Sequence, residues 1–420
     1  MHFSSRSHWA PTCCLWLLIS LCPPTSAATE TALQCTEASI VVDCGKTPSA
    51  IWYNGILWVV FAHREHLYVV HSRDKGQHYS VPVRVNSAPE TIETNGENRP
   101  KIALTDKAVI ISWTRKTEGS YTGDIRFSRS TDGGKTFAQP KTMNDDGQLA
   151  SHRFDSLIAS PSGIVYLTWL DKRNKLKARE RGKAYPGSAV YYTVSTDHGK
   201  TFSENFPVAD NSCECCRIAV APAENDRLAI FWRHIYPEST RDHAFAIVTP
   251  EGKIASRERA TFDDWQIDAC PHHGPDMGAT TGGYHLAWFS NGKQQRGILY
   301  GFYDVKEHSA RQVTSMDASA GASHPQVVQF GDKVYFAWKL FDGEQTRIQL
   351  ATSNDSGKSW SDSRTLAVTR GASDHPFLLA SEDNVYLTWH TQNEGFRVII
   401  AEASTDDIAE ASSDNKGVQK

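Results

Sequence analysis

A short apolar run that ends in tryptophan recurs along the chain. The runs predict many short β-strands joined by turns. Counting one looser copy at residues 55–61, there are about seven runs, spaced roughly fifty to sixty residues apart. This period fits one four-stranded propeller blade per unit. The regular copies end at Trp113, Trp169, Trp232, Trp288, Trp338 and Trp389.

The repeat therefore predicts an all-β fold, a β-propeller of four-stranded blades, with seven blades favoured and six as the alternative. One propeller domain is expected over residues 28–405, followed by a polar, disordered tail at 406–420. The last unit ends near Ser404 without an outer strand, so residues Ser39–Val42 are the expected partner that closes the ring. Residues 172–183 are a charged insertion in the third unit, expected as a loop.

A second phrase, Ser-x-Asp-x-Gly-x-x-aromatic, follows the tryptophan run in four units. Its Asp can accept backbone N–H bonds within a tight hairpin, and its Gly can adopt a positive φ. The phrase resembles the Asp-box, or BNR repeat, of the sialidase-like β-propellers, and the resemblance covers about residues 45–405. In that family the boxes lie on the outer rim, away from the catalytic face. The resemblance thus implies a structural role for Asp74, Asp132, Asp197 and Asp355.

A third phrase opens each unit and places polar residues before the tryptophan run. The first strand of each propeller blade lines the central channel, so these residues are expected to form a ring around one mouth of that channel. The ring would carry arginines on one arc and histidines on the other. Its members are Arg99, Arg153 and Arg217, and His273, His324 and His375.

The arginine arc is a candidate catalytic site, because arginine binds a carboxylate through two parallel hydrogen bonds. Sialidases, which this chain resembles in its repeats, use an arginine triad for a substrate carboxylate, a Tyr–Glu pair as nucleophile and an Asp as general acid. The resemblance implies an exo-acting glycoside hydrolase that uses Arg99, Arg153 and Arg217. The sequence departs from the family phrase Arg-x-Pro, because Arg99 directly precedes Pro100.

Cysteine and histidine residues at the starts of units four to seven form a candidate metal site. Thiolate and imidazole ligands together suit copper first and zinc next. In a strand, Cys213 and Cys215 would share a face while Cys216 would point the other way, so the cysteines are not expected to be equivalent ligands. The candidate ligands are Cys215, Cys216, Cys270, His272, His273, His324 and His375.

The phrases Cys-Cys-Arg and Cys-Pro-His-x-Gly-Pro are similar to those of a bacterial exported subgroup of sialidase-like proteins. Export is also indicated by residues 1–27, where a basic residue, an apolar run and small residues near Ala27 predict a signal peptide. The expected location is the periplasm or the exterior. Disulfides are the default there, so we expect a Cys35–Cys44 bridge and a bridge from Cys270 to a blade-four cysteine such as Cys213.

Composition excludes some partners. The chain has 420 residues, of which 40% are hydrophobic and 22% charged, enough to predict a packed core. A net charge of −4 without a long basic run argues against nucleic acid and anionic membrane. After the leader, no segment is apolar enough to span a membrane. The leading hypothesis is a propeller with a Cys/His site for copper. The alternatives are the glycoside hydrolase and a non-catalytic module that binds an anionic glycan or another exported protein.

Overall fold

The computed structural model of the chain describes residues 35–36 and 39–402. The predicted signal peptide and the predicted C-terminal tail lie outside the described residues. The chain divides into two compact units, Met1–Ser39 and Ile40–Lys420, and all the sheets belong to the second unit. Among the described residues, no helix is both long enough and apolar enough to cross a membrane.

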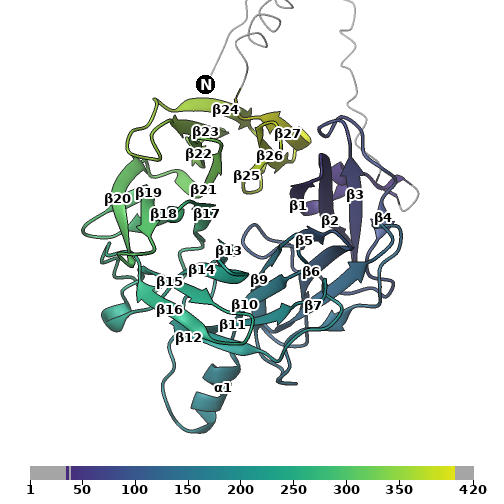
Figure 1. The fold of residues 1–420 in the computed structure, drawn as a ribbon, viewed down its shortest axis with the longest axis horizontal. Helices are drawn as coiled ribbons and strands as arrows, with labels where there is room; N and C mark the ends of the chain where they lie inside the picture. The colour runs from purple at the N-terminus through teal and green to yellow at the C-terminus, as the bar shows by residue number, and fades with distance from the viewer. Residues whose placement is uncertain (1–34, 37–38, 403–420) are drawn as a thin grey trace, which may run out of the picture. The chain divides into compact units, whose positions relative to one another are not determined.

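Seven antiparallel sheets make up the second unit, and in each sheet the strands pair in sequence order. Six sheets have four strands, and the last has three within the described residues. The first strand of every sheet faces the centre of the ring (Figure 1). The prediction of an all-β propeller with seven blades is confirmed, and the six-bladed alternative is wrong.

Each blade is a meander of short strands. Blade one contains β1 (Lys46–Tyr53), β2 (Ile56–His63), β3 (His66–Ser72) and β4 (Val83–Arg84). Blade two contains β5 (Lys101–Thr105), β6 (Ala108–Lys116), β7 (Gly123–Ser130) and β8 (Lys141–Thr142). Blade three contains β9 (His152–Ala159), β10 (Val165–Asp171), β11 (Ser188–Ser195) and β12 (Phe206–Ser212). Blade four contains β13 (Ala219–Ala223), β14 (Arg227–Arg233), β15 (His243–Val248) and β16 (Ile254–Arg259).

The remaining blades follow the same order. Blade five contains β17 (Asp276–Thr280), β18 (Gly283–Asn291), β19 (Arg296–Asp304) and β20 (Ser309–Asp317). Blade six contains β21 (Ala322–Phe330), β22 (Lys333–Phe341), β23 (Thr346–Ser353) and β24 (Arg364–Thr369). Blade seven contains β25 (Phe377–Ala380), β26 (Val385–Thr391) and β27 (Gly395–Ile400). In the part of this unit that the structure describes, there are also two short 3-10 helices, η2 (Val42–Cys44) and η3 (Pro237–Ser239), and one α-helix, α1 (Arg173–Glu180).

The recurring tryptophan lies near the end of the second strand in blades two to seven and packs between neighbouring blades. Trp169, for example, is fully buried in a cluster with Ile110 and Phe127 of the preceding blade. Several indole N–H groups also bond to carboxylates in the loops between blades, as Trp288 does to Asp263 at 2.8 Å. Replacing such a buried tryptophan by alanine costs about 3–5 kcal/mol. The sequence repeat is therefore the signature of the contacts between blades.

The ring closes differently from the prediction. Residues 40–44 form no strand; η2 packs against β27 and β2 instead. The Asp43 carboxylate accepts the backbone N–H of Phe396, in β27, at 2.7 Å, and Val42 is buried. Within the described residues the N-terminal segment thus stabilises the junction of blades seven and one without adding a fourth strand to blade seven.

The four Ser-x-Asp-x-Gly turns, which the sequence predicted to be Asp-box turns, join the third and fourth strands of their blades. In one of them the Asp132 carboxylate accepts the backbone N–H groups of Lys135 and Thr136, both at 3.0 Å, and the hydroxyl of Ser130 at 2.6 Å. In an antiparallel meander, this turn lies at the opposite end of the strands from the start of the first strand. The boxes are therefore remote from the predicted ring.

Candidate metal centre at the channel mouth

A cavity of about 820 Å³ lies at the end of the ring where the first strand of each blade begins. In each meander, the end of the second strand and the loop to the next blade lie at that same end. The cavity unites seven residues that the sequence indicated: Arg153, Cys215, Cys270, His272, His273, His324 and His375. The cavity is also lined by residues that the sequence did not indicate as part of a site: Asn95, Glu97, Tyr121, Lys172 and Glu214.

Three thiols converge where β12 passes into β13. Residues 213–216 form a turn rather than a strand, so the alternation predicted for them is wrong. The Sγ atom of Cys213 lies 3.8 Å from that of Cys215 and 3.9 Å from that of Cys216. All three side chains are buried. The turn thus brings Cys216 into the cluster, although strand geometry would have pointed it away.

The spacing of the three sulfur atoms suits a metal ion. With metal–sulfur bonds of about 2.3 Å, sulfur ligands in a tetrahedral or trigonal site lie roughly 3.8–4.0 Å apart. The distances of 3.8 and 3.9 Å from Cys213 match this requirement without rearrangement. A fully buried triad of soft donors suits a soft ion such as copper(I), or zinc.

The surroundings of the thiol cluster favour a thiolate at Cys213, whereas the neighbouring thiols and burial raise the pKa of Cys215 and Cys216. Hydrogen bonds from Cys215 and Cys216 hold the pKa of the Cys213 thiol well below its usual range, and the guanidinium groups of Arg233 and Arg241 act in the same direction. Both arginines are buried, and the carbonyl oxygens of Arg241 and His273 hold Arg233 in place. A buried cation beside the cluster offsets part of the negative charge that bound thiolates carry.

The cysteine pairing differs in part from the prediction. Cys35 and Cys44 are both disulfide-bonded, in agreement with the expected bridge. The bridge expected between Cys270 and Cys213 is absent, and all four cysteines from Cys213 onward are free. The physical reason is orientation: Cys213 faces Cys215 in the buried turn, whereas Cys270 lies exposed on the cavity wall.

A second group of donor atoms lies at the centre of the mouth, around the Glu97 carboxylate. Its Oε1 atom is 3.7 Å from Nε2 of His324 and 3.6 Å from Nδ1 of His375. The two imidazole rings stack with centroids 3.5 Å apart, and the ring of His273 is 5.1 Å from that of His324. The donor atoms of Glu97, His324 and His375 all lie within 4.8 Å of one another. The single Cys/His site predicted from sequence is therefore two groups in the structure.

The imidazoles of this group are held in the neutral form. Burial lowers the pKa of His273 to about 4, and the charge of Arg233 adds to the effect. Burial also lowers the pKa of His324 and His375 well below the usual range, helped by the charges of neighbouring histidines and Arg217. Neutral imidazole is the form that binds metal ions. Neither Cys270 nor His272 belongs to a group of convergent donor atoms among the described residues.

The three arginines do not form an open carboxylate clamp. Arg99 is 2% exposed and pairs with Asp374. Arg217 pairs with Glu97 at 3.3 Å and also donates to the carbonyl of Pro325 at 3.2 Å. Only Arg153 lines the cavity, and it pairs with Glu93 at 3.2 Å. Their guanidinium groups are already engaged by carboxylates of this chain.

Glu97 could have been suspected from the sequence, because it directly precedes the Asn98-Arg99-Pro100 phrase that opens unit two. The sequence indicated Cys213 only as a disulfide candidate, because an exported protein favours a bridge between Cys270 and a blade-four cysteine. The predicted loop after β10 is the helix α1, which projects from blade three (Figure 1). Its first residue, Arg173, is buried and bonds to Asp171 at 2.9 Å.

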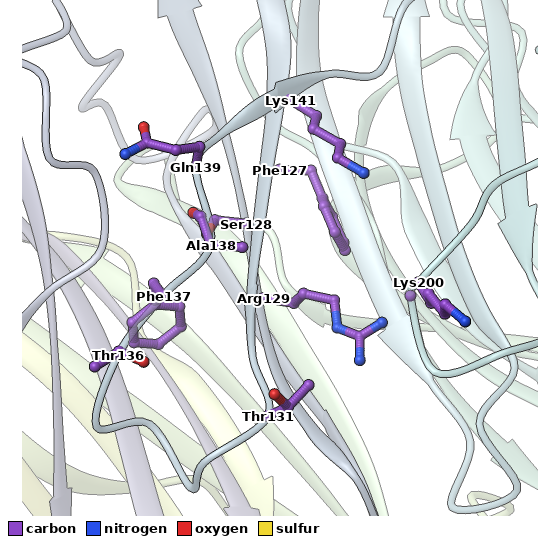
Figure 2. Close-up of a pocket in the computed structure, with 11 residues that line it drawn as sticks. Phe127, Ser128, Arg129, Thr131, Thr136, Phe137, Ala138, Gln139, Lys141 and Lys200 are labelled. Carbon is purple, nitrogen blue, oxygen red and sulfur yellow. The ribbon is translucent and has the colours of Figure 1, made fainter.

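A different cavity, of about 470 Å³, lies between blades two and three near the Asp-box turns (Figure 2). The basic side chains of Arg129, Lys141 and Lys200 reach into it beside Phe127 (Figure 2). Its lining includes no His, Cys, Asp or Glu. The metal-type donors of the described chain therefore concentrate at the other end of the blades.

No protein-family model matches the chain, and no curated protein matches it. Among solved structures, an ulvan lyase of polysaccharide lyase family PL25 is 13% identical with a TM-score of 0.52, covering 88% of this chain and 97% of that one. The polysaccharide lyase Uly1 is 11% identical with a TM-score of 0.52, covering 90% and 94%. The intramolecular trans-sialidase from Ruminococcus gnavus is 12% identical with a TM-score of 0.47, covering 74% and 96%. At these identities the similarity to the two lyases concerns the fold alone, a β-propeller.

Proposed function

We propose that this chain is an exported metal-binding propeller whose thiol cluster holds one soft metal ion, with copper(I) preferred and zinc as the second choice. The observation that carries the proposal is the cluster itself. Three free, buried thiols lie at metal-ligand spacing in a turn that opens toward the channel mouth. Cys213, Cys215 and Cys216 are the proposed ligands, which revises the ligand set that the sequence suggested.

The chemical environment supports copper(I) over harder ions. Thiolates are soft ligands and select copper(I), zinc or iron–sulfur clusters. Arg233 and Arg241 lie near the sulfurs and partly neutralise a thiolate complex. Clustered free thiols in an exported protein are exposed to oxidation, and a bound ion protects them. The proposal includes the export indicated by residues 1–27.

The direct test is an anaerobic titration of the mature chain with copper(I) against a coloured copper(I) chelator. Wild type should take about one equivalent from the chelator, and the double variant Cys213→Ser/Cys216→Ser should take none. Cys270→Ser is the matched control, because Cys270 is a free thiol outside the cluster, and it should behave as wild type. Full retention by the double variant, or no uptake by folded wild type, would overturn the proposal.

A second candidate function is the binding of an anionic glycan in the same cavity. This function needs no catalytic arginine triad. The wall of the cavity favours this function. There the guanidinium carbon of Arg153 lies 5.8 Å from the centroid of the exposed Tyr121 ring. Exposed aromatic rings beside arginine suit sugar carboxylates. Retention on immobilised acidic but not neutral polysaccharide, lost in Arg153→Ala, would support it.

A further inference from the structure

We propose that Glu97, His324 and His375 form a second ion site, for a divalent cation such as zinc(II) or copper(II), with one coordination position open to the cavity. The site does not use the cysteines and does not depend on copper(I) binding at the thiol cluster. Its donor set is borderline to hard, two imidazole nitrogens and one carboxylate oxygen, whereas the thiol cluster is soft. The two groups would therefore select different ions.

The first support is geometric. Three parts of the chain far apart in sequence supply the donors: the loop before β5, the strand β21 and the loop before β25. Glu97 Oε1 lies 3.7 Å from His324 Nε2 and 3.6 Å from His375 Nδ1. Ligands bound at about 2.0–2.1 Å in a tetrahedral site are roughly 3.4 Å apart. The two carboxylate–imidazole distances are thus within a few tenths of an ångström of this spacing, and all three donor atoms lie within 4.8 Å of one another. The stacked imidazole rings must also turn for both nitrogens to face one ion.

The second support is the way in which the chain orients the carboxylate. The other oxygen of Glu97, Oε2, accepts the backbone N–H of Arg217 at 2.8 Å and that of Gly274 at 3.0 Å. The Oε1 atom faces both imidazoles and also accepts a hydrogen bond from Nη1 of Arg217 at 3.3 Å. Outer hydrogen bonds of this kind fix ligating carboxylates in metal sites.

The ring of His375 is positioned by a close approach. A Cβ atom added to Gly96 would lie 2.3 Å from Cε1 and Nε2 of His375, so only glycine leaves room for the ring there. The ring is 12% exposed, and within the described chain its Nδ1 atom has no hydrogen-bond partner. Buried polar atoms are nearly always paired, and an ion at this position would satisfy the Nδ1 atom.

Charge balance suggests what the open position would take. Glu97 is paired with Arg217, and Arg99 with Asp374, while Lys339 adds a positive charge near both His324 and His375. A divalent ion would add uncompensated positive charge in a buried position, which favours an anionic fourth ligand from the cavity. Sites with three protein ligands and one open position are typical of ions that bind a water, hydroxide or substrate group.

The test uses cobalt(II) as the probe, in wild type whose thiol cluster has first been loaded with copper(I), or in the variant Cys213→Ser/Cys215→Ser/Cys216→Ser. We expect about one cobalt(II) per chain with the visible absorption of a four- or five-coordinate ion. Added acetate should shift that absorption, because it would fill the open position. His324→Ala and His375→Ala should each weaken cobalt(II) binding on the order of 100-fold or more.

His78→Ala is the matched control, because the His78 side chain is 86% exposed and lies at an Asp-box turn. It should bind cobalt(II) as wild type does. Circular dichroism and thermal melting identify any variant that has lost its fold. Copper(II) electron paramagnetic resonance gives a second readout on the chain with Cys213→Ser, Cys215→Ser, Cys216→Ser and Cys270→Ser, because free thiols would reduce copper(II). The resonance should show coupling to two imidazole nitrogens.

Three results would overturn the inference: no cobalt(II) uptake by the folded chain, unchanged uptake by both histidine variants, or a resonance without nitrogen coupling. These outcomes are distinguishable from failure of the copper(I) proposal. That proposal fails when the cysteine variant keeps copper(I), whatever cobalt(II) does.

Discussion

The Glu97 carboxylate accepts the backbone N–H of Arg217 at 2.8 Å, although the two residues are 120 positions apart. The same carboxylate pairs with the Arg217 guanidinium at 3.3 Å and accepts the N–H of Gly274 at 3.0 Å. One acidic side chain from the loop before β5 therefore connects the starts of blades four and five across the channel mouth.

Removal of Glu97 should destabilise the propeller. Glu97→Ala would leave the buried Arg217 guanidinium without its carboxylate, and breaking a buried ion pair costs about 3–5 kcal/mol. Urea denaturation should show a lower midpoint with an unchanged slope. Glu118→Ala, at an exposed loop position, is the control and should leave the midpoint unchanged. A wild-type midpoint for Glu97→Ala would mean that the network contributes little.

The glycine packed against the His375 ring should contribute to cobalt(II) affinity. Gly96→Ala would place a Cβ atom 2.3 Å from the His375 ring, so the ring must leave its present position beside Glu97. We expect cobalt(II) affinity to fall by about 10–100-fold, while copper(I) uptake by the thiols stays at the wild-type level. Gly278→Ala is the control, because a Cβ atom there would be 3.3 Å from the carbonyl of Val327, a tighter than usual contact that does not involve His375. Equal affinities in the two variants would contradict the packing argument.

The buried His152 should make stability depend on pH. Burial lowers its pKa, but the hydrogen bond to Asp146 and the charges of Asp171 and Asp146 outweigh that and raise the pKa above its usual range. A raised folded-state pKa means that the stabilisation is complete below the unfolded value of about 6.5 and is lost as pH rises through the folded value.

Urea denaturation of wild type and His152→Gln from pH 5 to pH 9 tests this sign. The difference in the free energy of unfolding should be largest at the acidic end and should shrink as pH rises. A difference that is constant, or that grows toward alkaline pH, would show that the imidazole is neutral in the folded chain.

The Asp-box turns should titrate at low pH. Hydrogen bonds from the side chain and backbone of Ser359, and from Ser353, lower the pKa of Asp355 to about 2. A lowered folded-state pKa gives stability that is present above the unfolded value of about 3.9 and is lost as pH falls toward 2. A carbon NMR titration of the carboxyl group should give a midpoint near 2. Ser359→Ala should raise that midpoint toward 4, whereas Ser361→Ala, whose hydroxyl does not bond to Asp355, should not.

The blade repeat could be predicted because it is a local pattern with a physical cause. Each tryptophan run forms the second strand of a blade, and its tryptophan is buried against the preceding blade. Every unit of the sequence therefore contains the residue that makes the contact between blades. The closure at Val42–Cys44 was mispredicted because one segment must satisfy both blade seven and blade one. A single copy of a segment carries no repeat that would indicate its conformation.

The candidate metal centre also could be predicted only where a repeated position is involved. The histidines His273, His324 and His375 were placed at one mouth because equivalent strand positions meet around a ring. The complete thiol triad was not predicted, because Cys213 was expected to form a disulfide with Cys270, and because residues 213–216 form a turn rather than the expected strand. Turn geometry depends on where β12 ends and β13 must begin, which the spacing of cysteines does not reveal.

The sequence by itself determined the repeating strand, the seven-fold architecture and the mouth at which polar residues gather, since these follow from local periodicity and from the burial that every blade requires. Only the tertiary structure decided which of those residues share a site. It divided the expected Cys/His set into a sulfur group and a Glu97–imidazole group, and it engaged the arginines in ion pairs. These choices depend on distances between loops of different blades, and such distances are set by the packing of the whole ring.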